Sequence, residues 1–176
     1  MLRKDKRGIS LVEIMVVIAI IGIVATVGIW GLNAVSSRPA QQCSHKLIYS
    51  LERNRVTVMG KSDAYYKVWI NDKDRVIFEE GVSNTAADEH GNYTYSVVSS
   101  EIGNSRVKLS YLTSAGEVAM GRGDSLTIRY DRGSGAFKSF TDQDGNGLVV
   151  TGLVAQSGGK RFVVRLVQVT GKVYLD

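Results

Sequence analysis

One stretch near the amino terminus constrains the fold of this chain more than any other. Residues 14–32 carry no charged side chain. At a helical rise of about 1.5 Å per residue this run extends about 28 Å, close to the thickness of a bilayer core. Glu13 immediately precedes the run, and a carboxylate inside a spanning helix costs about 2.5 to 3.5 kcal/mol on insertion scales. The stretch predicts a transmembrane helix. Because of this cost, the presence of a carboxylate at Glu13 needs a specific explanation.

Three interpretations fit this stretch. The first is an ordinary membrane anchor. The second is a secretory signal cut after Ser36, but the apolar run is longer than the roughly 7 to 15 residues of a signal h-region. The third rests on the residues at its start, Arg7-Gly8 followed by Ile9-Ser10-Leu11-Val12-Glu13.

These residues, followed by an unbroken apolar helix, resemble the prepilin signal of type IV pilins and type II secretion pseudopilins. The resemblance implies that a prepilin peptidase cuts after Gly8 and methylates the new amino terminus, Ile9. It also implies that Glu13 pairs with the methylated amino terminus of a neighbouring subunit, since a carboxylate dried by packed helices is stabilised by a nearby cation. The alternative is a carboxylate that reaches the membrane surface. The implied partners are other pilin or pseudopilin subunits, the peptidase and an inner-membrane assembly platform.

Net charge and cysteine content indicate the topology and the cellular compartment of the chain. The net charge is +5, of which the leader contributes +3, so basicity alone is weak evidence for nucleic-acid binding. A basic leader before a first span keeps the amino end in the cytoplasm, so we expect a single-pass cytoplasmic (inner) membrane protein with an extracytoplasmic globular domain. The resemblance implies that this protein later becomes part of a pilus or pseudopilus. Cys43 is the single cysteine, which excludes an internal disulfide, unlike many Gram-negative pilins. We expect it to be a small buried hydrophobe.

The domain organisation follows from a change of hydrophobic period. We expect a leader at 1–8, a transmembrane and filament-core helix at 9–35, an amphipathic helix at 36–60 and a β-rich domain at 61–176. Pro39 predicts a kink or a restart of the helix, and Gly60 its end. The predicted core stripe of the second helix has spacings of three and four: Ala40, Cys43, Leu47, Leu51, Asn54 and Val58.

Alternating patterns after Gly60 predict an antiparallel, strand-rich domain. The fold class is therefore α+β, with one long helix packed on a β domain, which also resembles the pilin architecture. The expected strands are 64–70, 75–78, 93–99, 106–112, 117–120, 125–130, 136–140, 161–169 and 172–175, with a polar loop at 82–92. Residues 140–147 (FTDQDGNG) and the closing Gly171-Lys172 hairpin are similar to segments of GspH/FimT-type minor pseudopilins.

Asp142, Asp144 and Asn146 place oxygen donors at every second position, as in the start of an EF-hand calcium loop. The pattern then fails, because Val150 and Leu153 occupy later ligand positions. A polar turn whose Asx side chains bond their own backbone is the favoured interpretation, with calcium a weak alternative and no cofactor expected.

Other motifs carry less weight. Arg122-Gly123-Asp124 is the integrin-binding tripeptide but also reads as a tight turn before a strand. His45 is expected to be exposed, and His90 lacks a second histidine or cysteine nearby, so it is a weak zinc candidate. No phosphate loop, dinucleotide fingerprint or nucleophile elbow is present, and we expect no enzymatic activity.

Basic residues near the end allow a nucleic-acid hypothesis. The candidates are Lys160, Arg161, Arg165 and Lys172. Some FimT-type pilins bind DNA through a Gly-Arg-x-Arg-like tail, which Gly171-Lys172-Val173-Tyr174 matches with one basic residue in place of two. Arg161 and Arg165 share a strand face, and a solvated face is the favoured reading.

The predicted function is therefore structural: a minor pilin or pseudopilin of a type IV pilus or a type II secretion or competence pseudopilus, assembled by packing of amino-terminal helices. The alternative is a DNA-binding minor pilin of a transformation machine. A third possibility is a bitopic anchor that presents a β domain for adhesion.

Overall fold

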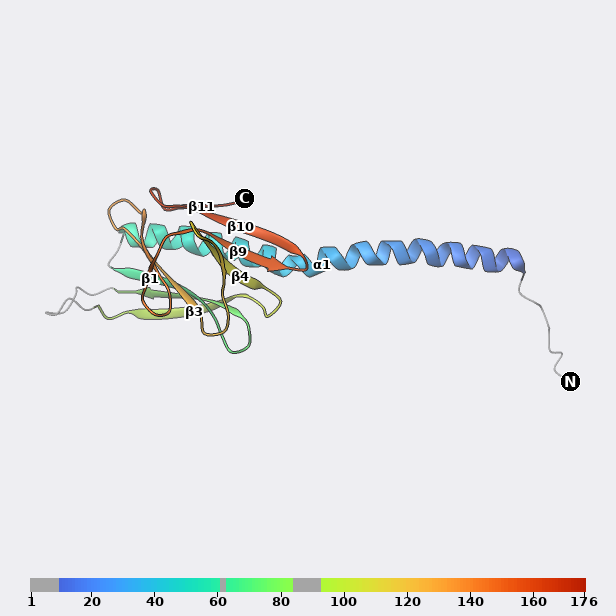
Figure 1. Ribbon diagram of the computed structural model, residues 1–176, viewed down its shortest axis with the longest axis horizontal. Helices are drawn as coiled ribbons and strands as arrows, with labels where there is room; N and C mark the ends of the chain where they lie inside the picture. The colour runs from blue at the N-terminus through green and yellow to red at the C-terminus, as the bar shows by residue number, and fades with distance from the viewer. Residues whose placement is uncertain (1–9, 61–62, 84–92) are drawn as a thin grey trace. The chain divides into compact units, whose positions relative to one another are not determined.

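The computed structural model describes residues 10–60, 63–83 and 93–176, and for residues 25–35 it describes the backbone alone. The chain divides into two compact units between Ser36 and Ser37. The helix and several of the strands are labelled in Figure 1. Within the described residues the fold is α+β, as the sequence predicts, with one α-helix and antiparallel sheets.

Helix α1 (Leu11–Gly60) begins where the amide of Ile14 donates to the Ser10 carbonyl at 3.2 Å. It ends at Gly60, as predicted. Pro39 lies inside the helix, so the prediction of a restart there is wrong. A proline inside a helix costs about 3 kcal/mol through one lost hydrogen bond and a clash, but its fixed φ is helical. The buried side chains that follow Pro39 offset this cost.

The amphipathic part of α1 buries the predicted stripe. Ala40, Cys43, Leu47 and Leu51 are fully buried, and Asn54 and Val58 are nearly so. The opposite face of the helix holds Lys46, Glu52 and Arg53, all exposed. The 3.6-residue period therefore placed the core face of this segment correctly.

Two antiparallel sheets complete the second unit. The first has the order β3-β2-β1-β6-β7-β8 and the second β11-β10-β9-β4-β5. The strands of the first sheet are β1 (Ala64–Ile70), β2 (Val76–Val82), β3 (Ser96–Gly103), β6 (Ser125–Tyr130), β7 (Phe137–Thr141) and β8 (Gly147–Leu148). Those of the second are β4 (Lys108–Thr113), β5 (Gly116–Ala119), β9 (Val150–Ser157), β10 (Lys160–Val167) and β11 (Lys172–Leu175).

The predicted strands agree with the structure at β1, β6 and β11 and are shifted by a few residues elsewhere. The strand expected at 75–78 extends to Val82, and the one expected at 93–99 begins at Ser96. Most of the predicted loop 82–92 lies outside the described residues. Strands β8 and β9 were not predicted from the sequence. Strand β9 was missed because it is buried on both faces at its centre and does not alternate.

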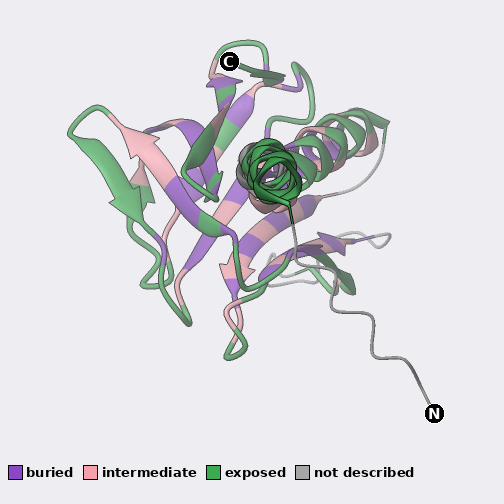
Figure 2. Ribbon diagram, turned by 90° about the vertical axis from the view of Figure 1, so that its right-hand side faces the viewer, coloured by how far each residue is buried: buried purple, intermediate pink, exposed green. Residues whose placement is uncertain are grey.

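The core lies between the stripe of α1 and the inner faces of both sheets, where Figure 2 shows buried residues in purple. Two tyrosines of the first sheet form hydrogen bonds to the backbone of the helix. The hydroxyl of Tyr66 donates to the Asn54 carbonyl at 3.1 Å, and that of Tyr130 to the Leu51 carbonyl at 3.2 Å. Burial raises the pKa of both phenols, so both remain neutral donors.

Candidate functional site

The amino-terminal part of α1 carries the residues that the sequence singled out most strongly. Glu13 lies in the first turn of the helix and is exposed. Ser10 and Glu13 have the spacing of a capping box, and a carboxylate in the first turn is favoured by the helix dipole. Gly8 and Ile9 lie outside the described residues. Glu13 can therefore act on its own helix end, on a partner's amino terminus, or on both.

Apolar side chains cover this part of the helix on every side. Every residue from 11 to 24 is exposed, and the exposed fraction reaches 74% at Leu11 and 65% at Ile23. A helix that is apolar all round needs cover from lipid or from other helices. Within the part of the chain that the structure describes, no helix meets the length and apolarity required to cross a membrane. The predicted span 9–35 falls partly outside that part, because the side chains of 25–35 are not described.

A second exposed stripe runs along the amphipathic part of α1. It holds His45, Tyr49, Glu52 and Val56, at spacings of four, three and four. Tyr49 is 68% exposed and Val56 69%. The exposure of His45 confirms the prediction. Two large apolar side chains on the face opposite the core form a ridge suited to contact another molecule.

The segment at Asp142 forms the predicted Asx turn. The Asp142 carboxylate accepts from the amides of Asp144 and Asn146 at 3.0 and 2.8 Å, and from the side-chain amide of Asn146 at 3.0 Å. The Asn146 side chain and these amides lower the pKa of Asp142. Its oxygens are thus already used as acceptors. Among the described residues, no three His, Cys, Asp or Glu side chains are grouped to hold a metal ion.

The Arg122-Gly123-Asp124 tripeptide is a tight turn before β6, as expected. Gly123 has a φ of +83°, which favours glycine. Arg122 forms a bidentate ion pair with Asp74, and Asp124 accepts from the Gly121 amide at 2.7 Å. Both charged side chains are therefore engaged within the domain. The other minor candidate, His90, lies outside the described residues.

The basic residues near the carboxyl end are partly neutralised by neighbouring acids. Arg161 pairs with Glu117 at 2.6 Å, and Arg165 pairs with Asp176 at 2.9 Å. Lys160 and Lys172 are exposed at the two ends of the β10–β11 hairpin. Ion pairing lowers the free positive charge that a phosphate backbone would meet.

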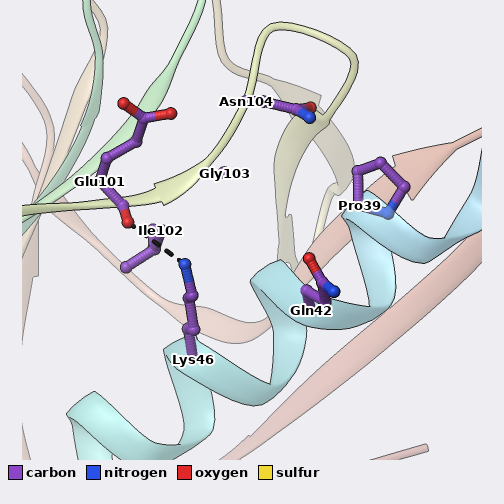
Figure 3. Close-up of a pocket in the computed structure, with 7 residues that line it drawn as sticks. All are labelled: Pro39, Gln42, Lys46, Glu101, Ile102, Gly103 and Asn104. Carbon is purple, nitrogen blue, oxygen red and sulfur yellow. Dashed lines mark hydrogen bonds between the residues drawn. The ribbon is translucent and has the colours of Figure 1, made fainter.

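A polar hollow of about 310 Å³ lies between α1 and the end of β3 (Figure 3). The ammonium of Lys46 donates to the Glu101 carbonyl at 3.5 Å, and the Glu101 carboxylate pairs with Arg75 at 2.7 Å. Cys43 is fully buried, and a Cβ built on the lining residue Gly103 would lie 3.1 Å from its Sγ. Burial raises the pKa of this thiol to about 12. This region therefore offers charged groups that already have partners and a thiol that stays protonated at neutral pH, so it presents no poised nucleophile.

Comparison with known proteins gives one match. Residues 3–29 match a protein family described as the prokaryotic N-terminal methylation motif. No curated protein matches the chain, and no solved structure matches it. The match identifies the amino-terminal signal as prepilin-like, spanning Gly8, Ile9 and Glu13, and supports a type IV pilin-like subunit in general. The pilin and methylation assignments are supported by this segment alone.

Proposed function

We propose that the chain is a structural subunit, a minor pilin or pseudopilin of the GspH/FimT type, in a type IV pilus or a type II secretion or competence pseudopilus. It has no catalytic role and needs no cofactor. The observation that carries the proposal is the methylation motif at the start of a helix that is apolar on all sides. Such a helix is covered by lipid before assembly and by the helices of other subunits afterwards.

Processing defines the mature subunit. The prepilin peptidase removes residues 1–8 after Gly8 and methylates Ile9. The basic leader keeps this end in the cytoplasm, the span crosses the inner membrane, and the domain from Ser37 onward lies outside. An assembly platform in that membrane then transfers the subunit into the filament.

Glu13 directs the contact between subunits. In the packed helices of a filament, its carboxylate loses water and pairs with the methylated amine of a neighbouring Ile9. A plain anchor would gain nothing from a carboxylate at this position and would carry its insertion cost. The exposed ridge of Tyr49 and Val56 offers a further contact surface in the second unit.

The DNA-binding alternative has less support. Both arginines of β10 are paired with acids, and the tail carries one basic residue where the DNA-binding pattern has two. The adhesion alternative depends on a tripeptide whose charged residues are engaged in the turn. Neither has an observation in its favour that the structural role lacks.

Intact-mass analysis of the chain purified from membranes and from filaments tests the proposal. We expect a mature chain that begins at Ile9 with one added methyl group. A chain that begins near Ser37 would indicate a secretory signal, and an intact Met1 a plain anchor. Either result would overturn the proposed function.

A further inference from the structure

Strand β3 forms one border of the first sheet, where Figure 1 labels it. Within the described part of the chain it pairs with β2 alone, so the backbone groups along its other edge have no strand partner. Residues 96–101 are exposed, and the exposed fraction is 52% at Val97 and 68% at Val98. An exposed edge strand is a template on which a further strand can pair.

The exposed half of β3 lacks the features that protect edge strands. Natural proteins keep such strands apart with short length, charged side chains, proline or a bulge that twists the edge away. Residues 96–100 (SVVSS) contain neither a charge nor a proline. The register shift between β2 and β3 lies between Val76 and Ile77, opposite the far end of β3. The exposed half is therefore regular, partly apolar and open to pairing.

The other edge strands of the two described sheets are protected. Strand β8 has two residues, and β5 and β11 have four each. Strand β5 carries Glu117, which pairs with Arg161, and β11 carries the exposed Lys172. Pairing β3 with either would cover at most four residues and would bring a charged residue next to the valines. Pairing β3 with a second β3 covers five residues, none of them charged, so length and charge select a second copy.

The sequence of β3 also favours one direction and register. Antiparallel pairing is the more stable per residue, and it keeps the Glu101 carboxylates of the two copies apart. Centred on Val98, it places Val98 opposite Val98, Val97 opposite Ser99 and Ser96 opposite Ser100. Apolar contact forms at the centre and serine hydroxyls meet at both ends, which are favourable cross-strand pairs.

We propose that β3 of one copy pairs with β3 of a second copy as an antiparallel ladder centred on Val98. The contact is isologous, so it joins copies in pairs and adds to the helix packing that builds a filament. Standard interfaces have about 20 to 30 residues a side, so a contact of this size needs copies that are held close together. The inference rests on the proposed function in that a shared membrane supplies this proximity.

Disulfide cross-linking of the full-length chain in membranes tests the pair. Val98→Cys places two thiols opposite each other, and directly opposite Cβ atoms of an antiparallel pair lie about 4.5 to 5.5 Å apart, close to the reach of a disulfide. We expect mild oxidation to yield a homodimer. Val118→Cys, at an exposed valine of β5, is the matched control and should yield at least tenfold less. Cys43 is fully buried, so the unmodified chain should stay monomeric.

A second set of variants tests the register. A copy with Val97→Cys and a differently tagged copy with Ser99→Cys should form a mixed dimer in higher yield than either copy forms with itself. Adding Val98→Lys to both copies places like charges opposite each other and should lower this yield at least tenfold. Val98→Lys in one copy and Val98→Glu in the other should restore it.

Three results would overturn the inference: no dimer of Val98→Cys, an equal yield at Val118, or a mixed dimer that Val98→Lys in both copies leaves unchanged. Any of these, found together with a mature Ile9 terminus and normal filament incorporation, would refute this contact alone and leave the proposed function intact. A chain that begins near Ser37 would lack the shared membrane and would overturn both.

Discussion

The packing of the α1 stripe on the two sheets can be tested at Leu47. Its side chain is fully buried at the centre of the stripe. Leu47→Ala keeps a good helix former, so the cost comes from lost burial and the cavity left behind, which for buried leucines is about 2.7 to 5 kcal/mol. For a unit of this size each kcal/mol lowers Tm by about 3 to 4 °C, which gives a fall of about 8 to 20 °C.

The matched control is Tyr49→Ala, two residues along the same helix and 68% exposed. Its effect on the free energy of unfolding should stay within about 0.5 kcal/mol. The assay is thermal unfolding of the full-length chain in detergent, followed by near-ultraviolet circular dichroism. A loss below about 1 kcal/mol for Leu47→Ala, or equal losses for both variants, would refute the burial of this helix face.

Three further predictions concern the smaller sites. Cys43 should resist thiol reagents at pH 8 until the domain unfolds. Burial raises the pKa of its thiol in the folded state from 9.0 to about 12. The stability that the buried thiol contributes is therefore complete below pH 9 and is lost between about pH 9 and 12, which denaturation measured as a function of pH tests. Calcium should change Tm by less than about 1 °C; a rise of several degrees that Asp144→Ala abolishes would establish a site at the Asx turn. The chain should bind DNA weakly at physiological salt, and sub-micromolar binding lost in Arg161→Glu with Arg165→Glu would favour the DNA-uptake alternative.

Local periodicity accounts for what the sequence predicted well. The α1 stripe follows from 3.6-residue spacing, and β1 alternates so regularly that both of its ends were predicted. Strand β9 was missed because its pattern depends on neighbours on both sides. A Cβ at its Gly152 would lie 3.0 Å from the Val164 carbonyl oxygen, a constraint that only the paired strand reveals.

The candidate sites also differ in whether neighbouring residues in the sequence are enough to predict them. The processing signal could be predicted from the sequence because it consists of consecutive residues around Gly8. A hollow of about 190 Å³ on the flank of α1 was not predicted, because it joins Asn54 of the helix to Phe78 and Val98 of two strands. Its one sequence signal is Asn54 itself, a polar residue in an apolar stripe, since a buried amide needs a partner.

Filament incorporation of Glu13 variants tests the central claim most directly. Glu13→Gln keeps the capping-box spacing but removes the charge, whereas Glu13→Ala removes both. Cleavage after Gly8 and the membrane pool should be unchanged in both variants. Breaking a buried pair costs about 3 to 5 kcal/mol, so the filament pool should fall at least tenfold in both. Equal filament pools for the wild type and Glu13→Gln would contradict a charge-paired assembly contact at Glu13.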